Sequence, residues 1–269
     1  MSANNAHIKR LLATKQCQGG DLRDAHLTRL NLSGADLSGA KLMFANLNGT
    51  NLSNANLSGA ELSFANFVAA DLINSDLSGV DAKGVNFLDA KLNHAQLGGA
   101  DLVFANLVNT NLEEANLSGA SLEGANLIGA NLNNTQMNGI NLSGANLGHA
   151  QIRSANLSNA DLSNARLVEA DLSDANLSGV NLRNANLLNA NLNGANLTGA
   201  DLTGANLSQA KLDGAIGLYQ DNLVGMRPPD RPPATSHNHP NMSYVSVLQT
   251  NSLHSSSNHL GLPRPGLPS

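Results

Sequence analysis

The 269-residue sequence contains no tryptophan, and aromatic residues make up only 3% of it. That is too few large rings for an ordinary globular core of this length. Charged residues contribute 13%, about half of the usual share, which excludes a strongly charged tail protein and a basic nucleic-acid binder. The formal net charge of −5 agrees with this, so we expect no direct nucleic-acid binding.

Cysteine and long apolar runs are also scarce. Cys17 is the only cysteine, which excludes an intrachain disulfide framework and a multi-cysteine zinc site. No stretch approaches the ~18 consecutive apolar residues of a membrane span, and the opening MSANNAHIKRLLATKQ lacks a signal-peptide core. We therefore expect a cytoplasmic protein without a membrane span.

What the sequence does contain is a five-residue repeat. From Gly20 to Gly214 it forms 39 consecutive pentapeptides, and Leu occupies the central position of 34 of them. Ala stands two residues before the centre in 29 units, and Asn or Asp stands one residue before it in 29. A period of five matches neither the 3.6 of a helix nor the 2 of a strand. The backbone must therefore turn a corner in every unit.

A second period of 20 residues shows how many corners complete a coil. Apolar residues recur directly after the centre in one 20-residue column, namely Val68, Leu88, Val108, Ile128, Val168 and Leu188. Glycine fills another such column, at Gly39, Gly59, Gly79, Gly99, Gly119, Gly139, Gly179 and Gly199. Both columns predict that four pentapeptides form one square coil. Coils stacked ~4.8 Å apart, like parallel strands, would give about ten coils and a rod roughly 47 Å long.

This geometry gives each residue type a place. We expect Leu and Ala to point inward, and the small Ala82 between Val80 and Val85 indicates an exchange that conserves volume. Ser-Gly corners suit a type II turn, which needs positive φ at its third residue, and the corners without glycine are expected to use a different turn. All eight prolines lie at or beyond Pro228, as expected if each coil needs its backbone donors.

Runs such as Ala55-Asn56-Leu57-Ser58-Gly59 and Ala200-Asp201-Leu202-Thr203-Gly204 resemble the A(D/N)LXX signature of the pentapeptide-repeat family. The resemblance covers about 195 residues, and the entry segment 11–22 is similar to the start of many cyanobacterial members. It implies an all-β fold, a right-handed quadrilateral parallel β-helix, in agreement with the period. Many of those members carry a second cysteine where this chain has Gly20, so a paired-thiol role for Cys17 is not expected.

The ends of the chain differ from the repeat. Ile8, Leu11, Leu12 and Lys15 have helical spacing after Asn4 and Asn5, so residues 1–17 are expected to form a capping helix over the solenoid 18–217. Residues 218–226 would form either a second cap or a homodimer contact at the C-terminal end. Residues 227–269 are rich in Pro, Ser, His and Asn and predict a disordered tail, whose proline clusters are candidates for docking on an aromatic groove.

The repeat offers little chemistry for catalysis. Its polar side chains are splayed outward over a filled interior, whereas an active site needs groups that converge in a pocket. Glu113 and Glu114 fit a solvated corner, and no carboxylate partner is evident for His94 or His149. The tail histidines lack metal-ligand spacing. We expect no catalytic residue, cofactor or metal.

Two apolar columns are candidate protein-binding surfaces. Phe44, Phe64 and Phe104 share one 20-residue column at a corner, which favours protein docking because stacking would make a long exposed stripe. The aliphatic column, represented by Val68, Leu88, Val108 and Ile128, is a second candidate. The alternative is that its members stabilise the wall by stacking on one another, and the pattern favours this alternative for the aliphatic column.

A third column is acidic. Glu61, Asp81 and Asp101 belong to it, and residues 20–214 carry a net charge of −9. This resembles the family members that imitate DNA and bind type II topoisomerases such as DNA gyrase, although Ser121, Asn141 and Asn181 interrupt the column. A neighbouring column rich in Asn is expected to hydrogen-bond from coil to coil. The sequence thus predicts a non-enzymatic, rigid scaffold for an unidentified protein partner, with a DNA-mimicking topoisomerase ligand as the alternative.

Overall fold

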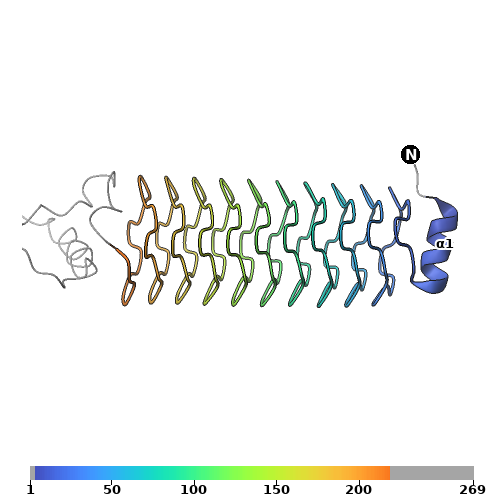
Figure 1. The fold of residues 1–269 in the computed structure, drawn as a ribbon, viewed down its shortest axis with the longest axis horizontal. Coiled ribbons are helices and arrows are strands. Elements are labelled where there is room, and N and C mark those ends of the chain that lie inside the picture. Colours follow the sequence, from blue (N-terminus) through green and yellow to red (C-terminus); the bar gives the residue numbers. More distant parts are fainter. Residues whose placement is uncertain (1–3, 219–269) are drawn as a thin grey trace, which may run out of the picture.

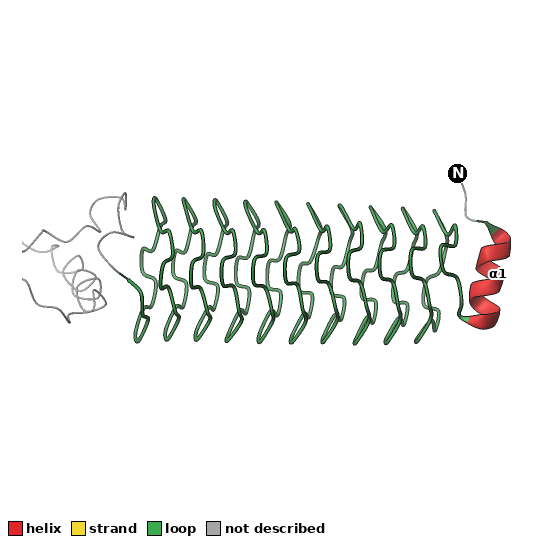
Figure 2. Cartoon of the chain, in the orientation of Figure 1, coloured by secondary structure: helices red, strands yellow, loops and turns green. Residues whose placement is uncertain are grey.

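The computed structural model describes residues 4–218, in which one element of regular secondary structure occurs, the helix α1 (Asn5–Thr14). Figure 1 shows the remainder as a rod of stacked coils with α1 lying across its N-terminal end. Figure 2 colours all of these coils as loop. Of the segment 218–226, predicted to form a C-terminal cap or a dimer contact, only Leu218 is described, and the predicted tail 227–269 lies outside the described residues.

The coils are held together by parallel bridges between residues twenty positions apart, from Gln16 with Asp36 to Asn196 with Ile216. Twenty residues are four pentapeptides, so the 20-residue period read from the sequence is confirmed as the repeat of the coil. Each bridge is a single residue pair and not a longer strand. The reason is that a turn interrupts the extended backbone in every five-residue unit.

Every corner uses the same left-handed backbone position. The second residue after each centre has φ between +53° and +73° in all units from residue 19 to residue 214. The corners with and without glycine therefore share this left-handed residue, and Asn, Asp and even Phe adopt the positive φ where glycine is absent. Whether the turn type differs between these corners stays a prediction.

Backbone hydrogen bonds account for four of the five amides in a unit. In the unit 55–59, the Leu57 and Gly59 amides donate to the next coil at 2.7 and 2.9 Å, and the Asn56 amide donates to the previous coil at 2.9 Å. The Ala55 amide closes the preceding turn at 3.0 Å. The fifth amide, that of Ser58, donates to Asn56 Oδ1 at 3.0 Å.

This fifth hydrogen bond explains the Asn and Asp column. From residue 21 to residue 206, each Asn or Asp before a centre, except Asp81, accepts a hydrogen bond from the amide two residues later. Short side chains with an acceptor oxygen are suited to such local bonds. The backbone of each unit thus favours Asn or Asp at this position.

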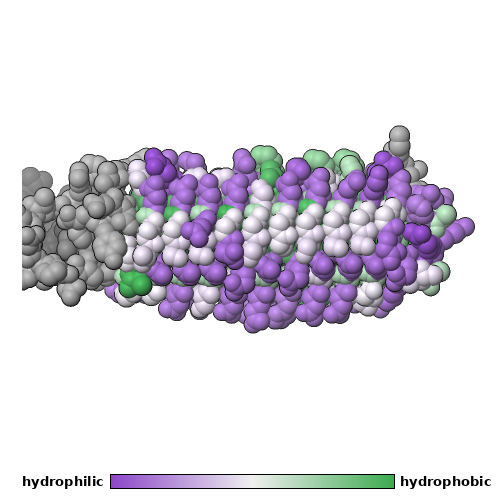
Figure 3. Space-filling view, viewed as in Figure 1, coloured by the Kyte–Doolittle hydropathy of each residue, from purple (hydrophilic) through white to green (hydrophobic). Residues whose placement is uncertain are grey.

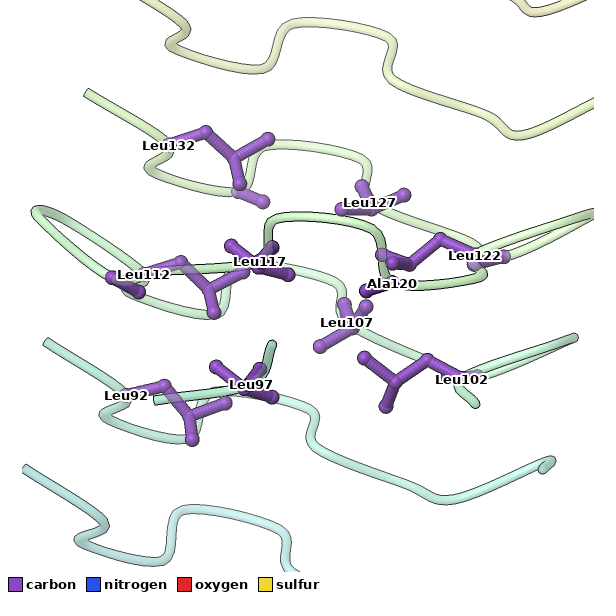
Figure 4. Packing of buried hydrophobic residues seen from close by; sticks show 14 of the residues in the cluster. Leu92, Leu97, Leu102, Leu107, Leu112, Leu117, Ala120, Leu122, Leu127 and Leu132 are labelled. Atoms are coloured by element: carbon purple, nitrogen blue, oxygen red, sulfur yellow. The ribbon is translucent and has the colours of Figure 1, made fainter. Parts of the chain in front are cut away.

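The interior is filled by the Leu and Ala positions, which are nearly all buried. Figure 4 shows leucines of successive coils, such as Leu92 and Leu112, pointing into the same interior. Phe67 and Phe87 are fully buried, with ring centroids 5.0 Å apart. Ala82 is buried in the same coil as Phe87, so the small side chain accompanies a large one.

Four polar residues replace Ala in the core, and each buried hydroxyl is satisfied. Thr50 Oγ1 donates to the Leu27 carbonyl at 2.6 Å, and Thr110 Oγ1 donates to the Phe87 carbonyl at 2.8 Å. Ser75 and Thr135 donate within their own turns. These hydroxyls therefore complete the core and do not mark a polar site.

The helix α1 covers the first coil, as predicted, but it is shorter than the expected range of residues 1–17. Asn4 Oδ1 caps it by accepting from the Ala6 amide at 2.9 Å. Leu11 is buried, whereas Leu12, predicted to lie on the same apolar face, is 52% exposed. The Asp21 amide donates to His7 Nδ1 at 2.8 Å, which ties the helix to the solenoid.

Candidate protein-docking surface

Three phenylalanines project from one corner of the rod, and we name them the Phe corner: Phe44, Phe64 and Phe104. Their exposed fractions are 58%, 59% and 70%, the largest among the described phenylalanines. Phe44 and Phe64, in adjacent coils, stack with centroids 5.4 Å apart and an interplanar angle of 7°. The predicted column is thus brought together as a stacked pair followed by a separate ring.

Glycines lie beneath Phe64 and Phe104, the two rings of the Phe corner that have no phenylalanine twenty positions later. A Cβ placed on Gly84 would lie 2.7 Å from the Phe64 ring, and one on Gly124 would lie 2.5 Å from the Phe104 ring. Each ring therefore leans along the rod over the residue twenty positions later. These glycines were not predicted from the sequence, although the succession of Phe and Gly within one column indicates them.

The backbone of this corner disfavours phenylalanine. All three phenylalanines have φ between +57° and +59°, in the left-handed region where a bulky side chain is an outlier. The left-handed conformation costs a residue with a Cβ roughly 1–2 kcal/mol. Contact with the neighbouring coil offsets part of this cost, but most of each ring remains in water. Such residues are a recognised starting point for a functional hypothesis.

The aliphatic column is a different kind of surface. Val68, Leu88, Val108 and Ile128 are only partly exposed, and none of them is among the strongly exposed large hydrophobics. Gly148 interrupts the column one coil after Ile128. In Figure 3 strongly apolar groups emerge from the visible face only in scattered places. The burial favours stacking within the wall for this column and docking for the Phe corner.

Cations of a neighbouring column pair with the acidic column. Lys83 Nζ lies 3.1 Å from Asp81 Oδ1 and 2.7 Å from Asp101 Oδ2, so it bridges two of the three predicted acidic residues. The hydrogen bonds that Lys83 donates to Asp101 and Asp81 raise its pKa. Partial burial raises the pKa of Asp81, but hydrogen bonds from Ser63 and Lys83 outweigh it and lower the pKa overall.

Similar pairs occur at both ends of this column. Arg23 binds Asp21 at 2.6 Å, and Arg183 binds Asp201 at 3.1 Å. The side-chain hydrogen bond from Arg23 lowers the pKa of Asp21 to about 2. Glu61 has no cation within ion-pair distance among the described residues. The acidic column is therefore partly neutralised by cations of a neighbouring column and is not a continuous line of unpaired negative charge.

The asparagine ladder forms in part. Asn106 Nδ2 donates to Asn86 Oδ1 at 2.9 Å, and Asn206 Nδ2 donates to Asn186 Oδ1 at 3.1 Å, each from one coil to the previous one. Most asparagine oxygens in this column are also engaged by the amide of their own unit. The asparagine side chains of this column are therefore structural. The hydrogen bond to the amide of their own unit is more regular than the hydrogen bond between coils.

The histidines do have carboxylate partners, contrary to the expectation from the sequence. His94 Nδ1 lies 3.3 Å from Glu114, and His149 Nδ1 lies 3.3 Å from Glu169. Both partners stand twenty residues later in the same column, so the coil period places them. All four side chains are at least half exposed on corners, which leaves them without the enclosed environment that acid–base catalysis requires.

Residues 4–218 offer no metal site and no membrane span. No group of three or more His, Cys, Asp or Glu in this range could hold a metal ion. The only helix there, α1, is too short to cross a bilayer. Cys17 is buried beneath α1, with its Sγ 3.7 Å from Arg10 Nη2.

Comparisons with known proteins agree with the geometry. The family described as Pentapeptide repeats matches in eight copies over residues 17–43, 37–72, 65–102, 105–144, 145–184 and 181–216. A search of curated proteins gave no match.

Among solved structures, the chain is 36% identical to HetL, a pentapeptide repeat protein involved in heterocyst differentiation regulation from the cyanobacterium Nostoc sp. strain PCC 7120. The match covers 80% of this chain and 97% of HetL, with a TM-score of 0.28. QnrB1, a plasmid-mediated fluoroquinolone resistance protein, is 19% identical over 68% of this chain and 87% of its own, with a TM-score of 0.44.

A pentapeptide repeat protein of the Arabidopsis thaliana thylakoid lumen is 29% identical over 42% of this chain and 69% of its own, with a TM-score of 0.22. The family matches extend over most of the region in which the structure forms parallel bridges. The chain therefore belongs to the pentapeptide repeat family, whose fold is a right-handed β-helical solenoid.

Proposed function

We propose that this protein is a non-enzymatic, rigid scaffold of the cytoplasm that binds a protein partner through the Phe corner. The observation that carries the proposal is the placement of Phe44, Phe64 and Phe104, which are more than half exposed at left-handed backbone positions. Exposed aromatic rings on a rigid frame can supply large contact area with little loss of side-chain entropy. The solenoid holds the rings at fixed separations along its axis.

Substitutions within the same column separate binding from folding. The full-length chain with Phe44→Gly, Phe64→Gly and Phe104→Gly keeps the corner backbone, because glycine adopts positive φ readily. A matched control changes Asn164 and Asn184 to Gly, at positive-φ positions of the same column farther along the rod.

Affinity capture from the native cell is the measurement. The proposal expects the wild type and the Asn→Gly control to retain the same proteins, and the Phe→Gly variant to lose them. Circular dichroism checks that all three chains are folded. Capture of the same proteins by the Phe→Gly variant would contradict the proposal.

The alternative is a DNA-mimicking ligand of a type II topoisomerase. Such mimicry needs a dense line of negative charge, since duplex DNA carries one phosphate per ~1.7 Å of its axis. Lys83 lies between Asp81 and Asp101, and further ion pairs occur at Asp21 and Asp201. We therefore favour the scaffold and expect no effect of stoichiometric excess on gyrase supercoiling; inhibition or protection in that assay would reverse the preference.

The homodimer predicted at the C-terminal end is a separate proposal. Ile216, near the last described residue, is 58% exposed, and it is the side chain that a contact there would cover. Sedimentation of the wild type and of Ile216→Ser tests this: a dimer that dissociates in the variant supports the contact. A monomeric wild type at high concentration would remove it.

A further inference from the structure

The chain carries a segment whose chemistry complements the Phe corner. We propose that the closing segment 262–268, Leu262-Pro263-Arg264-Pro265-Gly266-Leu267-Pro268, docks along the Phe corner of the same molecule. The inference rests on the proposed function, because it takes the corner to be a docking surface and names its occupant. The segment lies outside the described residues and is known here by its sequence alone.

The spacing of the rings matches the spacing of such a segment. Phe64 and Phe104 lie two coils apart, which is about 9.6 Å at a coil separation of ~4.8 Å. A proline-rich segment in the polyproline II conformation rises ~3.1 Å per residue and places every third side chain on one edge, about 9.3 Å apart. Leu262, Pro265 and Pro268 have this three-residue spacing. Successive members of this edge can therefore meet successive exposed rings.

The intervening coil is suited to a chain lying along the corner. Gly84 stands between Phe64 and Phe104 in the column and adds no side chain of its own, and the Phe64 ring lies over it. Proline rings pack well on aromatic faces, which is how proline-rich segments are bound by aromatic-lined surfaces. The corner thus presents two separate exposed rings, Phe64 and Phe104, to an extended apolar edge.

Charge favours the same occupant. Glu61 and Glu123, on the side of the rod next to the Phe corner, have no cation within ion-pair distance in residues 4–218. Arg264 is the cation of the closing segment, and it lies between two prolines. The repeat region has a net charge of −9, whereas the segment is positive. A carboxylate at one of these positions can therefore pair with the Arg264 guanidinium while the prolines contact the rings.

The connecting chain is long enough. Phe104 and Phe64 lie about five to seven coils from the C-terminal end of the rod, or roughly 24–34 Å. The 44 residues from Leu218 to Leu262 have a typical end-to-end distance of about 35–40 Å if they behave as a flexible chain. An intramolecular contact with a linker of this length is favoured by an effective concentration in the millimolar range. A protein partner would compete with the segment for the same rings.

A spin label on the full-length chain tests the proposal. Ser269→Cys places a reactive thiol beside the segment, while the native Cys17 is fully buried and leaves the label site-specific. Nuclear magnetic resonance of the isotope-labelled protein then reports which amides the nitroxide broadens. The expected result is loss of signal for amides near Phe64 and Phe104. Amides at the opposite corner, near Asn74 and His94, should keep their intensity.

Two variants and one mixture complete the test. The broadening at the Phe corner should disappear with Pro263→Ser, Arg264→Ser and Pro265→Ser in the labelled chain, and also with the three Phe→Gly changes. A mixture of isotope-labelled protein without nitroxide and unlabelled protein with nitroxide should show no broadening. Broadening in the mixture assigns the contact to a second copy and overturns the proposal.

Other results of the spin-label experiment would also contradict the intramolecular contact. Equal effects at both corners, no effect, or an effect confined to the C-terminal end of the rod would each overturn the intramolecular contact. The proposed function has a separate readout, because the Phe→Gly chain loses or keeps its captured proteins irrespective of the tail. Loss of partners without broadening would leave the docking surface standing and remove only this occupant.

Discussion

Replacing Gly84 with Ala tests the contact between residues twenty positions apart. Gly84 has φ +60°, and a Cβ there would lie 2.7 Å from the Phe64 ring. Gly59 has nearly the same backbone, with φ +63°, but a Cβ on it would meet nothing within 4 Å. The two substitutions therefore share the backbone cost and differ in the clash.

The magnitudes follow from this comparison. Ala at a left-handed position costs roughly 1–2 kcal/mol, which is the whole expected effect of Gly59→Ala. Gly84→Ala should cost about 1 kcal/mol more, at the low end for overpacking because the ring can shift at its far end. In a Phe64→Ser background the extra cost should vanish, which is the signature of direct coupling.

Urea unfolding of the full-length chain, followed by circular dichroism, measures these differences. The account predicts a lower free energy of unfolding for Gly84→Ala than for Gly59→Ala, and equal effects once Phe64 is removed. Equal effects in the wild-type background would show that the Phe64 ring does not lie over the next coil. An extra cost that persists without Phe64 would assign it to something other than the ring.

Three further predictions concern the core, the corner amides and acid. Leu117→Ala should lower the free energy of unfolding by about 2–5 kcal/mol, because Leu117 is fully buried; a urea midpoint close to the wild type would argue against a tightly packed interior. Asn56→Ala should cost about 1–2 kcal/mol by removing the acceptor of the Ser58 amide, whereas Asn56→Asp keeps that acceptor and should cost much less. The pKa of Asp21 is lowered to about 2 by the hydrogen bond from Arg23, so its contribution to stability is present above pH ~4 and is lost as the pH falls toward 2. Asp21→Asn should flatten the dependence of the melting temperature on pH in that window, and an unchanged acid profile would contradict the assignment.

The architecture was readable from the sequence because the same period appears in independent columns. Leu at the centres predicted the interior, and the recurrence of Val68, Leu88 and Val108 predicted the 20-residue coil that the bridges confirm. The position of α1 followed from its N-terminal cap and helical spacing. Its bounds and the exposure of Leu12 did not, since they depend on how the helix sits on the first coil.

The surface was less predictable, for two physical reasons. Corner conformation is set by stacking on neighbouring coils and not by local preference alone, so Asn, Asp and Phe share with glycine a backbone that composition assigned to glycine only. Side-chain partners depend on which residues stand twenty positions apart, as for His94 with Glu114. Lys83 likewise bridges carboxylates from two coils, which a column of acidic residues alone does not reveal.

The central claim is that the corner phenylalanines are retained for binding and not for folding, and Phe104→Gly tests it most directly. Glycine relieves the left-handed backbone but removes the small part of the ring that is buried, so the two effects nearly cancel. The account predicts a free energy of unfolding within about 1 kcal/mol of the wild type. A loss of about 3 kcal/mol or more, as for a buried phenylalanine, would show that Phe104 supports the wall and would contradict the claim.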